Sequence, residues 1–147
     1  MANPLFDTLF GKHAGNPAVF LHLADGQTIT YDGFLAMAAQ YAGLICDLGL
    51  TAGDRLAVQI AKSPQALAVY AACAQAGVVF LPLNTAYTAD EVSYFVENSG
   101  AGLLLCDQSK AEGLAPVAQA CGAQLETLNA DGTGSFSDKA AAMPVQF

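Results

Sequence analysis

Residues 78–91 constrain the fold of this chain more than any other segment, because they join a buried strand to a capped helix. Residues 78–81 are apolar and β-branched or aromatic, which is typical of a strand, and Pro82 cannot donate to a sheet ladder. Thr88 and Glu91 have the spacing of a capping box, in which the Thr hydroxyl and the Glu carboxylate accept from each other's backbone amides. The segment therefore predicts a strand, a turn and a helix that begins just after Thr88.

The rest of the chain continues this alternation. Strands are predicted over residues 55–60, 78–81, 102–106 and 123–128, with helices over 64–76, 89–98 and 110–121 between them. Repeated strand-then-helix order implies right-handed crossovers and a parallel sheet. The fold class is therefore predicted to be α/β, with three layers and a doubly wound, mostly parallel sheet.

Three further elements are predicted before the first parallel strand. Residues 3–10 have the pattern of a short amphipathic helix. Residues 18–23 and 28–31 flank Asp25-Gly26, a dipeptide that strongly favours a hairpin turn, so an antiparallel hairpin is added at the N-terminal side. A helix follows it, with apolar residues at helical spacing over 34–48. Asp32 is the expected cap of this helix.

The last part of the chain differs in composition from the rest. Residues 129–138 are rich in Gly, Ser and Asp, and the residues after them show little pattern. We therefore expect one α/β unit over residues 1–128, followed by a loop or linker over 129–147.

Charge excludes some classes of partner. The chain has a net charge of -8 and no basic stripe, so nucleic acid is not an expected partner and anionic membrane surfaces are disfavoured. Charged residues make up only 12% of the sequence, against a typical value of about 25%. So few charges favour an exposed apolar patch, and we expect the chain by itself to self-associate.

One uncharged stretch, residues 66–83, has nearly the length of a membrane-spanning helix, about 17 residues at least. Gly77 and Pro82 divide it, so a buried helix followed by a buried strand is the favoured interpretation.

Residues 1–7 lack the basic lead and apolar core of a signal peptide. The four cysteines are far apart in sequence, which favours buried thiols over a zinc site. Together these features predict a cytoplasmic protein without a metal site.

Two glycine-rich segments are candidate nucleotide-binding loops. Residues 100–102 precede their strand instead of following it, and residues 132–135 have Ser137 where a third glycine would stand. Both are better explained as turns. His13 and His22 have no evident partner for acid–base chemistry. No catalytic residue is predicted within the chain.

Several of these segments together resemble the N-terminal region of the adenylate-forming acyl-CoA synthetases. The resemblance covers roughly residues 17–128 and includes Gly-Asp-Arg-Leu-Ala-Val at 53–58 and an A-C-x-x-A-G-x-x-x-x-P-L-N pattern at 72–84. Within the family, residues 81–88, with Glu91 and Tyr94-Phe95 beyond them, are most similar to malonyl-CoA synthetases.

This resemblance implies a reaction for a longer parent protein. Such enzymes make an acyl-adenylate from a carboxylic acid and ATP, with Mg, and pass the acyl group to CoA. Malonate is the acid that the resemblance implies. The family's Ser/Thr/Gly-rich phosphate-binding loop and its C-terminal lysine would lie beyond Phe147. The chain is therefore expected to be a fragment that needs the remainder of the same ligase, that is inactive alone, and that binds none of these cofactors by itself.

Lys110 is the one candidate site residue. It follows the strand at 102–106, at the edge where ligands bind in open parallel sheets. In related acetyl-CoA-forming enzymes, basic residues of the corresponding region meet the 3′-phosphate of CoA, so the resemblance suggests this role for Lys110. The alternative is a solvated lysine at a helix start. For the whole chain, the alternative to a ligase fragment is a stand-alone, non-catalytic α/β binding or interaction module.

Overall fold

The computed structural model describes residues 3–147, so the first two residues of the expected 1–128 unit lie outside it. In chain order the elements are α1 (Pro4–Leu9), a 3-10 turn (Gly11–His13), β1 (Val19–His22), β2 (Thr28–Thr30), α2 (Tyr31–Asp47), β3 (Arg55–Gln59), α3 (Pro64–Ala76), β4 (Val79–Pro82), α4 (Ala89–Ser99), β5 (Leu103–Cys106), α5 (Gln108–Cys121), β6 (Gln124–Thr127) and α6 (Ser135–Ala140).

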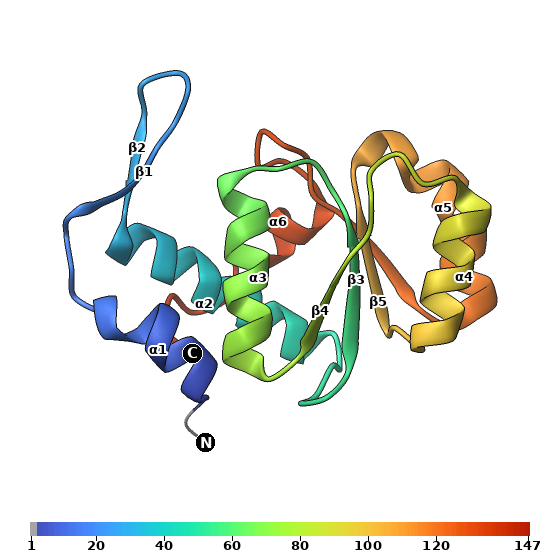
Figure 1. The fold of residues 1–147 in the computed structure, drawn as a ribbon, viewed down its shortest axis with the longest axis horizontal. Coiled ribbons are helices and arrows are strands. Elements are labelled where there is room, and N and C mark those ends of the chain that lie inside the picture. Colours follow the sequence, from blue (N-terminus) through green and yellow to red (C-terminus); the bar gives the residue numbers. More distant parts are fainter. Residues whose placement is uncertain (1–2) are drawn as a thin grey trace.

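The core of the molecule is a four-stranded parallel sheet in the order β4-β3-β5-β6. Alternate residues of the strands face opposite sides, as the pleat requires. Leu56 and Leu105 pack with α2, α3 and α6, whereas Ala57 and Leu104 pack with α4 and α5. Figure 1 shows these two helical layers on either side of the sheet. The predicted three-layer, doubly wound α/β fold is confirmed.

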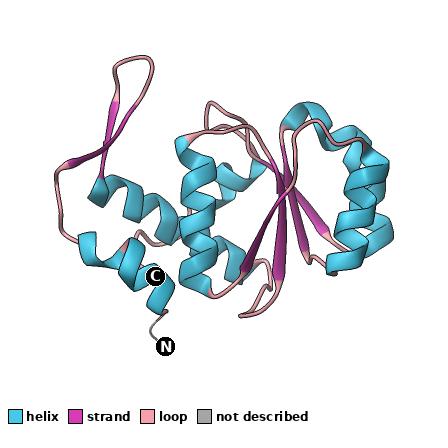
Figure 2. Ribbon diagram, in the orientation of Figure 1, coloured by secondary structure: helices cyan, strands magenta, loops and turns pink. Residues whose placement is uncertain are grey.

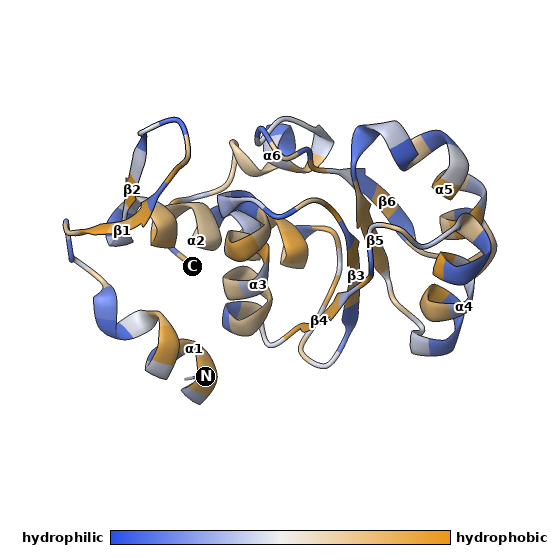
Figure 3. Cartoon of the chain, turned by 45° about the horizontal axis from the view of Figure 1, so that its top comes forward, coloured by the Kyte–Doolittle hydropathy of each residue, from blue (hydrophilic) through white to orange (hydrophobic). Residues whose placement is uncertain are grey.

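The hydropathy of the helices matches these layers. In Figure 3, α3 is coloured largely hydrophobic, whereas α4 and α5 mix hydrophobic and hydrophilic stretches. Helix α3 is buried over much of its surface, from Ala68 to Ala74, whereas α4 buries only Val92 and Val96 and α5 only Leu114 and Ala118. The layer of α2 and α3 therefore contributes the larger share of the core.

The predicted hairpin is also present. Strands β1 and β2 pair antiparallel in a sheet of their own, which projects from the three-layer body in Figure 2. The Asp25 carboxylate accepts from the amide of Gln27 at 2.9 Å, and Gly26 has a φ of 85°, as this tight turn requires. At the base of the hairpin Tyr31 stacks on Phe20, with ring centroids 4.6 Å apart.

The expected loop over residues 129–147 is wrong for Ser135–Ala140, which form α6. Phe136 is fully buried, and its ring packs against Tyr41 of α2 with centroids 5.0 Å apart. Burial raises the pKa of the Tyr41 phenol, although a hydrogen bond with Ser137 partly offsets this. The Gly/Ser/Asp composition indicates a loop correctly for the residues before Ser135. A short helix nevertheless forms after them, where Phe136 is buried and Lys139 pairs with Glu126 of β6.

The cap of α2 also differs from the prediction. The hydroxyl of Thr30, not the carboxylate of Asp32, accepts from the backbone at this helix start, from the amide of Gly33 at 3.1 Å. Asp32 instead lies in the first turn, where a negative charge is favourable. The helix therefore begins at Tyr31, directly after β2.

Arg55 ties the amino edge of the sheet to the end of α4. Its guanidinium donates to the carbonyls of Ser99 at 2.6 Å, Gly100 at 3.1 Å and Gly53 at 3.1 Å. The last carbonyls of a helix have no partner within the helix. A cation placed there both donates to these carbonyls and interacts favourably with the negative end of the helix dipole.

We expect Arg55→Met to lower the free energy of unfolding by about 2 kcal/mol, because it keeps much of the apolar stem but removes three charged donors. Urea denaturation followed by circular dichroism would measure this. Lys62→Met removes one positive charge from an exposed side chain and is the matched control. Equal losses in the two variants would show that charge alone, not the contacts of Arg55, stabilises the fold.

Candidate functional site

The order of the strands places a crevice at one edge of the sheet. From β3 the chain moves through α3 on one face to β4, and then through α4 on the other face to β5, on the opposite side of β3. Helix α5, which follows β5, packs on the same face as α4, so the connections after β3 and β5 leave toward opposite faces. Ligands of open parallel sheets bind outside the carboxyl ends of such strands.

A cavity of about 220 Å³ lies at this edge, and we call it the β3–β5 cavity. It is lined by residues from the end of β3, the start of α4 and the first turns of α5: Gln59, Tyr87, Ala89, Ser109, Lys110, Gly113 and Leu114. The lining combines an aromatic and an apolar wall with one amide, one hydroxyl and one ammonium group. Such a mixture is typical of small-molecule sites.

Gln59 is the last residue of β3 and is 1% exposed. Its side-chain nitrogen Nε2 donates to two backbone carbonyls of the loop after β4, to Asn84 at 2.9 Å and to Tyr87 at 3.1 Å. Its Oε1 has no hydrogen-bond partner among the residues that the structure describes. Gln59 therefore fixes this loop, and its Oε1 is buried without a donor among the described residues.

The loop from Asn84 to Thr88 is also held by its own side chains. The amide oxygen of Asn84 accepts from the backbone of Ala86 at 2.9 Å. The predicted capping box is present: Glu91 accepts from the Thr88 amide at 2.8 Å, and the Thr88 hydroxyl accepts from the Glu91 amide at 3.4 Å. These contacts give a structural explanation for the presence of Asn84, Thr88 and Glu91 in the segment 78–91.

Lys110 lies in the first turn of α5 and lines the β3–β5 cavity beside Gln59. Its ammonium donates to the carbonyl of Thr85, in the same loop that Gln59 holds. The structure therefore brings Lys110 and Gln59 together across two elements. Gln59 was not among the predicted site residues, although a Gln at the end of the apolar strand Leu56-Ala57-Val58 was a signal that could have identified it.

Cys106 ends β5 directly opposite Gln59 and behaves as a structural thiol. Its pKa is raised to about 11, mainly by burial and also by the nearby Asp107 carboxylate, while the Lys110 ammonium opposes both effects. A thiol with so high a pKa stays protonated near neutral pH and is a poor nucleophile.

The other candidates from the sequence lie elsewhere. His13 stacks on Tyr31 with ring centroids 4.2 Å apart, and Gly134 lies against the backbone of β6. Across residues 3–147, no three His, Cys, Asp or Glu side chains come close enough together to hold a metal ion. In that same range, no helix combines the length and hydrophobicity needed to cross a bilayer.

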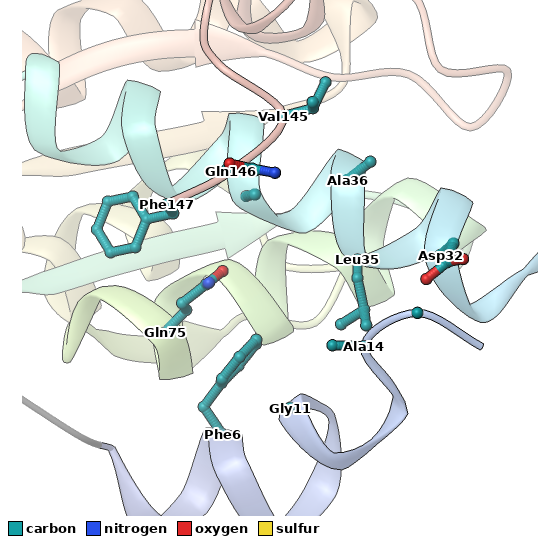
Figure 4. Close-up of a pocket in the computed structure, with 12 residues that line it drawn as sticks. Phe6, Gly11, Ala14, Asp32, Leu35, Ala36, Gln75, Val145, Gln146 and Phe147 are labelled. Carbon is teal, nitrogen blue, oxygen red and sulfur yellow. The ribbon is translucent and has the colours of Figure 1, made fainter.

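A larger cavity, of about 410 Å³, lies between α1, α2 and the C-terminal segment. Figure 4 shows Phe6, Leu35, Gln75 and Phe147 around it. Oε1 of Gln75 also has no hydrogen-bond partner among residues 3–147, but this side chain is only half-buried. The β3–β5 cavity is the better candidate site, because it lies at the carboxyl edge of the sheet and is lined by both Lys110 and the buried Gln59.

The fold and this edge define the class as a doubly wound α/β unit with a candidate small-molecule site at its strand ends. A family model described as "AMP-binding enzyme" matches residues 6–144. Because the match includes nearly the whole chain, the protein belongs to the AMP-binding enzyme family.

Individual relatives agree with this. The fold superimposes on the crystal structure of MatB from Rhodopseudomonas palustris with a TM-score of 0.94 and 41% identity, over 100% of this chain and 29% of that chain. Among curated proteins, surfactin synthase subunit 2 of Bacillus subtilis is 32% identical over 69% of this chain, and fatty acid–[acyl-carrier-protein] ligase ScoC of Streptomyces coeruleorubidus is 34% identical over 62%. The chain spans 3% and 17% of the lengths of those two proteins.

Proposed function

We propose that this chain is part of an acid–CoA ligase that activates malonate. In the first step the malonate carboxylate attacks the α-phosphate of ATP, which gives malonyl-adenylate and diphosphate. In the second the thiol of CoA displaces AMP and malonyl-CoA forms. The observation that carries the proposal is the 41% identity with MatB over the whole of this chain. The likeness of residues 81–88 to malonyl-CoA synthetases supports the choice of acid.

Of the groups that this reaction requires, CoA is the one that a residue of this chain, Lys110, fits. An ammonium has three donors, so Lys110 can keep its bond to Thr85 while a second N–H meets a phosphate oxygen of CoA. CoA supplies the thiol that accepts the acyl group. A MatB structure is described as ATP bound. We propose that the ATP and Mg sites of the present enzyme are formed by the remainder of the same ligase, which would be its first partner.

The proposal can be tested by exchanging segments. We expect a chimera that carries residues 1–147 in place of the matching part of MatB to retain malonate-dependent exchange of diphosphate into ATP. We expect the 147-residue chain alone to show none. A folded chimera that activates other acids but not malonate would contradict the assignment of substrate, and exchange by the isolated chain would contradict its inactivity.

The role of Lys110 has its own readout in that chimera. We expect Lys110→Gln to raise the KM for CoA about tenfold, as loss of one charge-assisted hydrogen bond of about 1.5 kcal/mol implies, with the KM for malonate unchanged. Lys62→Gln, at an exposed lysine outside the cavity, is the matched control. An unchanged KM for CoA would leave Lys110 with only its structural bond to Thr85.

We also propose that the isolated chain self-associates through its apolar surface. Leu5, Val79 and Phe147 are each about half exposed, at 51%, 48% and 56%. Exposed apolar groups of this kind favour association. Light scattering at high protein concentration should give a mass above that of one chain, and a monomeric mass would contradict the proposal.

A further inference from the structure

We propose that the outer face of α4 binds a segment of a separate partner protein that carries closely spaced arginine side chains. Helix α4 lies on the opposite side of the sheet from α3 (Figure 1) and buries only Val92 and Val96, so most of its surface faces outward. This interaction lies outside the proposed reaction and does not depend on it. The surface, which we call the α4 face, consists of three aromatic and three acidic residues: Tyr87, Asp90, Glu91, Tyr94, Phe95 and Glu97.

The aromatic rings of the α4 face are stacked on one another but not covered. The rings of Tyr87 and Phe95 lie nearly parallel with centroids 5.2 Å apart, and Tyr94 meets Phe95 edge-on at 5.4 Å. Tyr94 is 64% exposed, the largest exposed fraction of any exposed large hydrophobic side chain in residues 3–147. With Asp90 and Glu91 these rings line a surface hollow of about 400 Å³. Grouped, exposed aromatic side chains of this kind are typical of protein interaction sites.

The charges of the α4 face determine the chemistry of its partner. Asp90, Tyr94 and Glu97 follow one another at spacings of four and three residues, so they lie along one side of the helix. Helix α4 contains no Lys or Arg, and the one ion pair within residues 3–147 joins Lys139 to Glu126. The carboxylates beside the exposed tyrosine are therefore not neutralised by a cation from the described part of this chain.

An arginine side chain matches both features of the α4 face. Its planar guanidinium can stack on an aromatic ring and donate to a carboxylate, whereas the ammonium of lysine is more strongly hydrated and forms no such stack. The net charge of -8 attracts a cationic partner and repels nucleic acid. A second copy of the chain would bring the same carboxylates against one another. Within residues 3–147 the acidic side chains form no group that could hold a metal ion.

A matched pair of peptides tests the role of the guanidinium. Acetyl-Arg-Ala-Ala-Arg-amide carries two guanidinium groups, whereas the same peptide with citrulline in place of arginine carries neutral groups of nearly the same shape. In the ¹⁵N-labelled chain we expect the arginine peptide to shift the backbone amide signals of Tyr94 and Phe95 saturably. Its affinity should exceed that of the citrulline peptide about tenfold, the effect of two cations on exposed aromatic rings. Equal affinities, or equal shifts throughout α2, would overturn the proposal.

Variants assign the binding to the α4 face. We expect Tyr94→Ser and Asp90→Asn each to weaken binding of the arginine peptide about threefold, because each removes one of the two features that the guanidinium contacts. Asp47→Asn, at an exposed acid of α2 in the other helical layer, is the matched control and should bind as the unchanged chain does. Equal losses in Asp90→Asn and Asp47→Asn would show that net charge alone attracts the peptide, and would overturn the proposal.

Two further measurements distinguish a separate partner from other occupants of the α4 face. We expect the arginine peptide to bind the folded chimera of residues 1–147 with the remainder of MatB as tightly as it binds the chain alone. Loss of binding in the chimera would show that the remainder of the ligase covers this face. A lower mass of the self-associated chain in Tyr94→Ser, measured by light scattering, would place a second copy there. Either result would overturn the proposal.

Discussion

Gly134→Ala is expected to lower the free energy of unfolding by about 4 kcal/mol, the sum of backbone strain and overpacking that are each worth about 1–3 kcal/mol. Gly134 has a φ of 134°, and an added Cβ would lie 2.3 Å from the carbonyl oxygen of Thr127 and 3.1 Å from the Cα of Leu128. Both neighbours are backbone atoms at the end of β6, so no side chain can move aside. Urea denaturation would measure the loss against a typical domain stability of about 5–15 kcal/mol.

Gly26 is the control that separates the cost of backbone strain from the cost of steric overlap. Gly26 also has a positive φ, 85°, but no atom lies within 4 Å of the position that its Cβ would take. We expect Gly26→Ala to cost only about 1–2 kcal/mol, the penalty of a left-handed conformation. Similar losses at the two positions would show that the approach of Gly134 to β6 is not the cause.

Phe136→Ala is expected to cost about 3–5 kcal/mol, the range for removing a fully buried aromatic ring. Its contact with Tyr41 gives an independent signal: removal of the ring hydrates the Tyr41 phenol, so the raised pKa of that group should fall toward its ordinary value of 10.0. An ultraviolet titration of tyrosinate would follow this change. The control is Phe147→Ala, at a ring 56% exposed, with an expected effect within about 0.5 kcal/mol.

Were Phe136→Ala to cost no more than Phe147→Ala, α6 would not contribute to the core. In that case residues 129–147 would act as the linker that their composition suggests. Phe136→Leu tests the same point with less risk of unfolding, because it retains much of the buried apolar surface.

Much of the fold could be predicted from the sequence because its signals are local. The capping box at Thr88 and Glu91, the Asp25-Gly26 turn and the start of α3 after Ser63 each depend on residues within four positions of one another. The strand boundaries were accordingly predicted to within one residue. Pro82 was expected to follow its strand, but it is the last paired residue of β4, opposite Val58, because an edge strand tolerates a missing donor.

The parts that could not be predicted depend on distant residues. Ser135–Ala140 are helical because Phe136 finds a place on α2, which no local pattern of a Gly- and Ser-rich tail indicates. In the candidate site, the edge rule for parallel sheets and the family resemblance together pointed to Lys110, which lines the β3–β5 cavity. Gln59 was missed because its two partners follow it by 25 and 28 positions, in a loop whose path was not known.

The contact of α6 with α2 also bears on how the chain folds as the ribosome makes it. The hydroxyls of Tyr41 and Ser137 meet across 96 positions, whereas α2 and α3 are consecutive helices of the same layer. Every strand of the parallel sheet has been synthesised before Ser135, so the sheet and its first helices can assemble while the α2 surface beneath Phe136 is still uncovered. Helix α6 therefore closes this part of the core only after the strands of the sheet and Ser135–Ala140 itself have been synthesised.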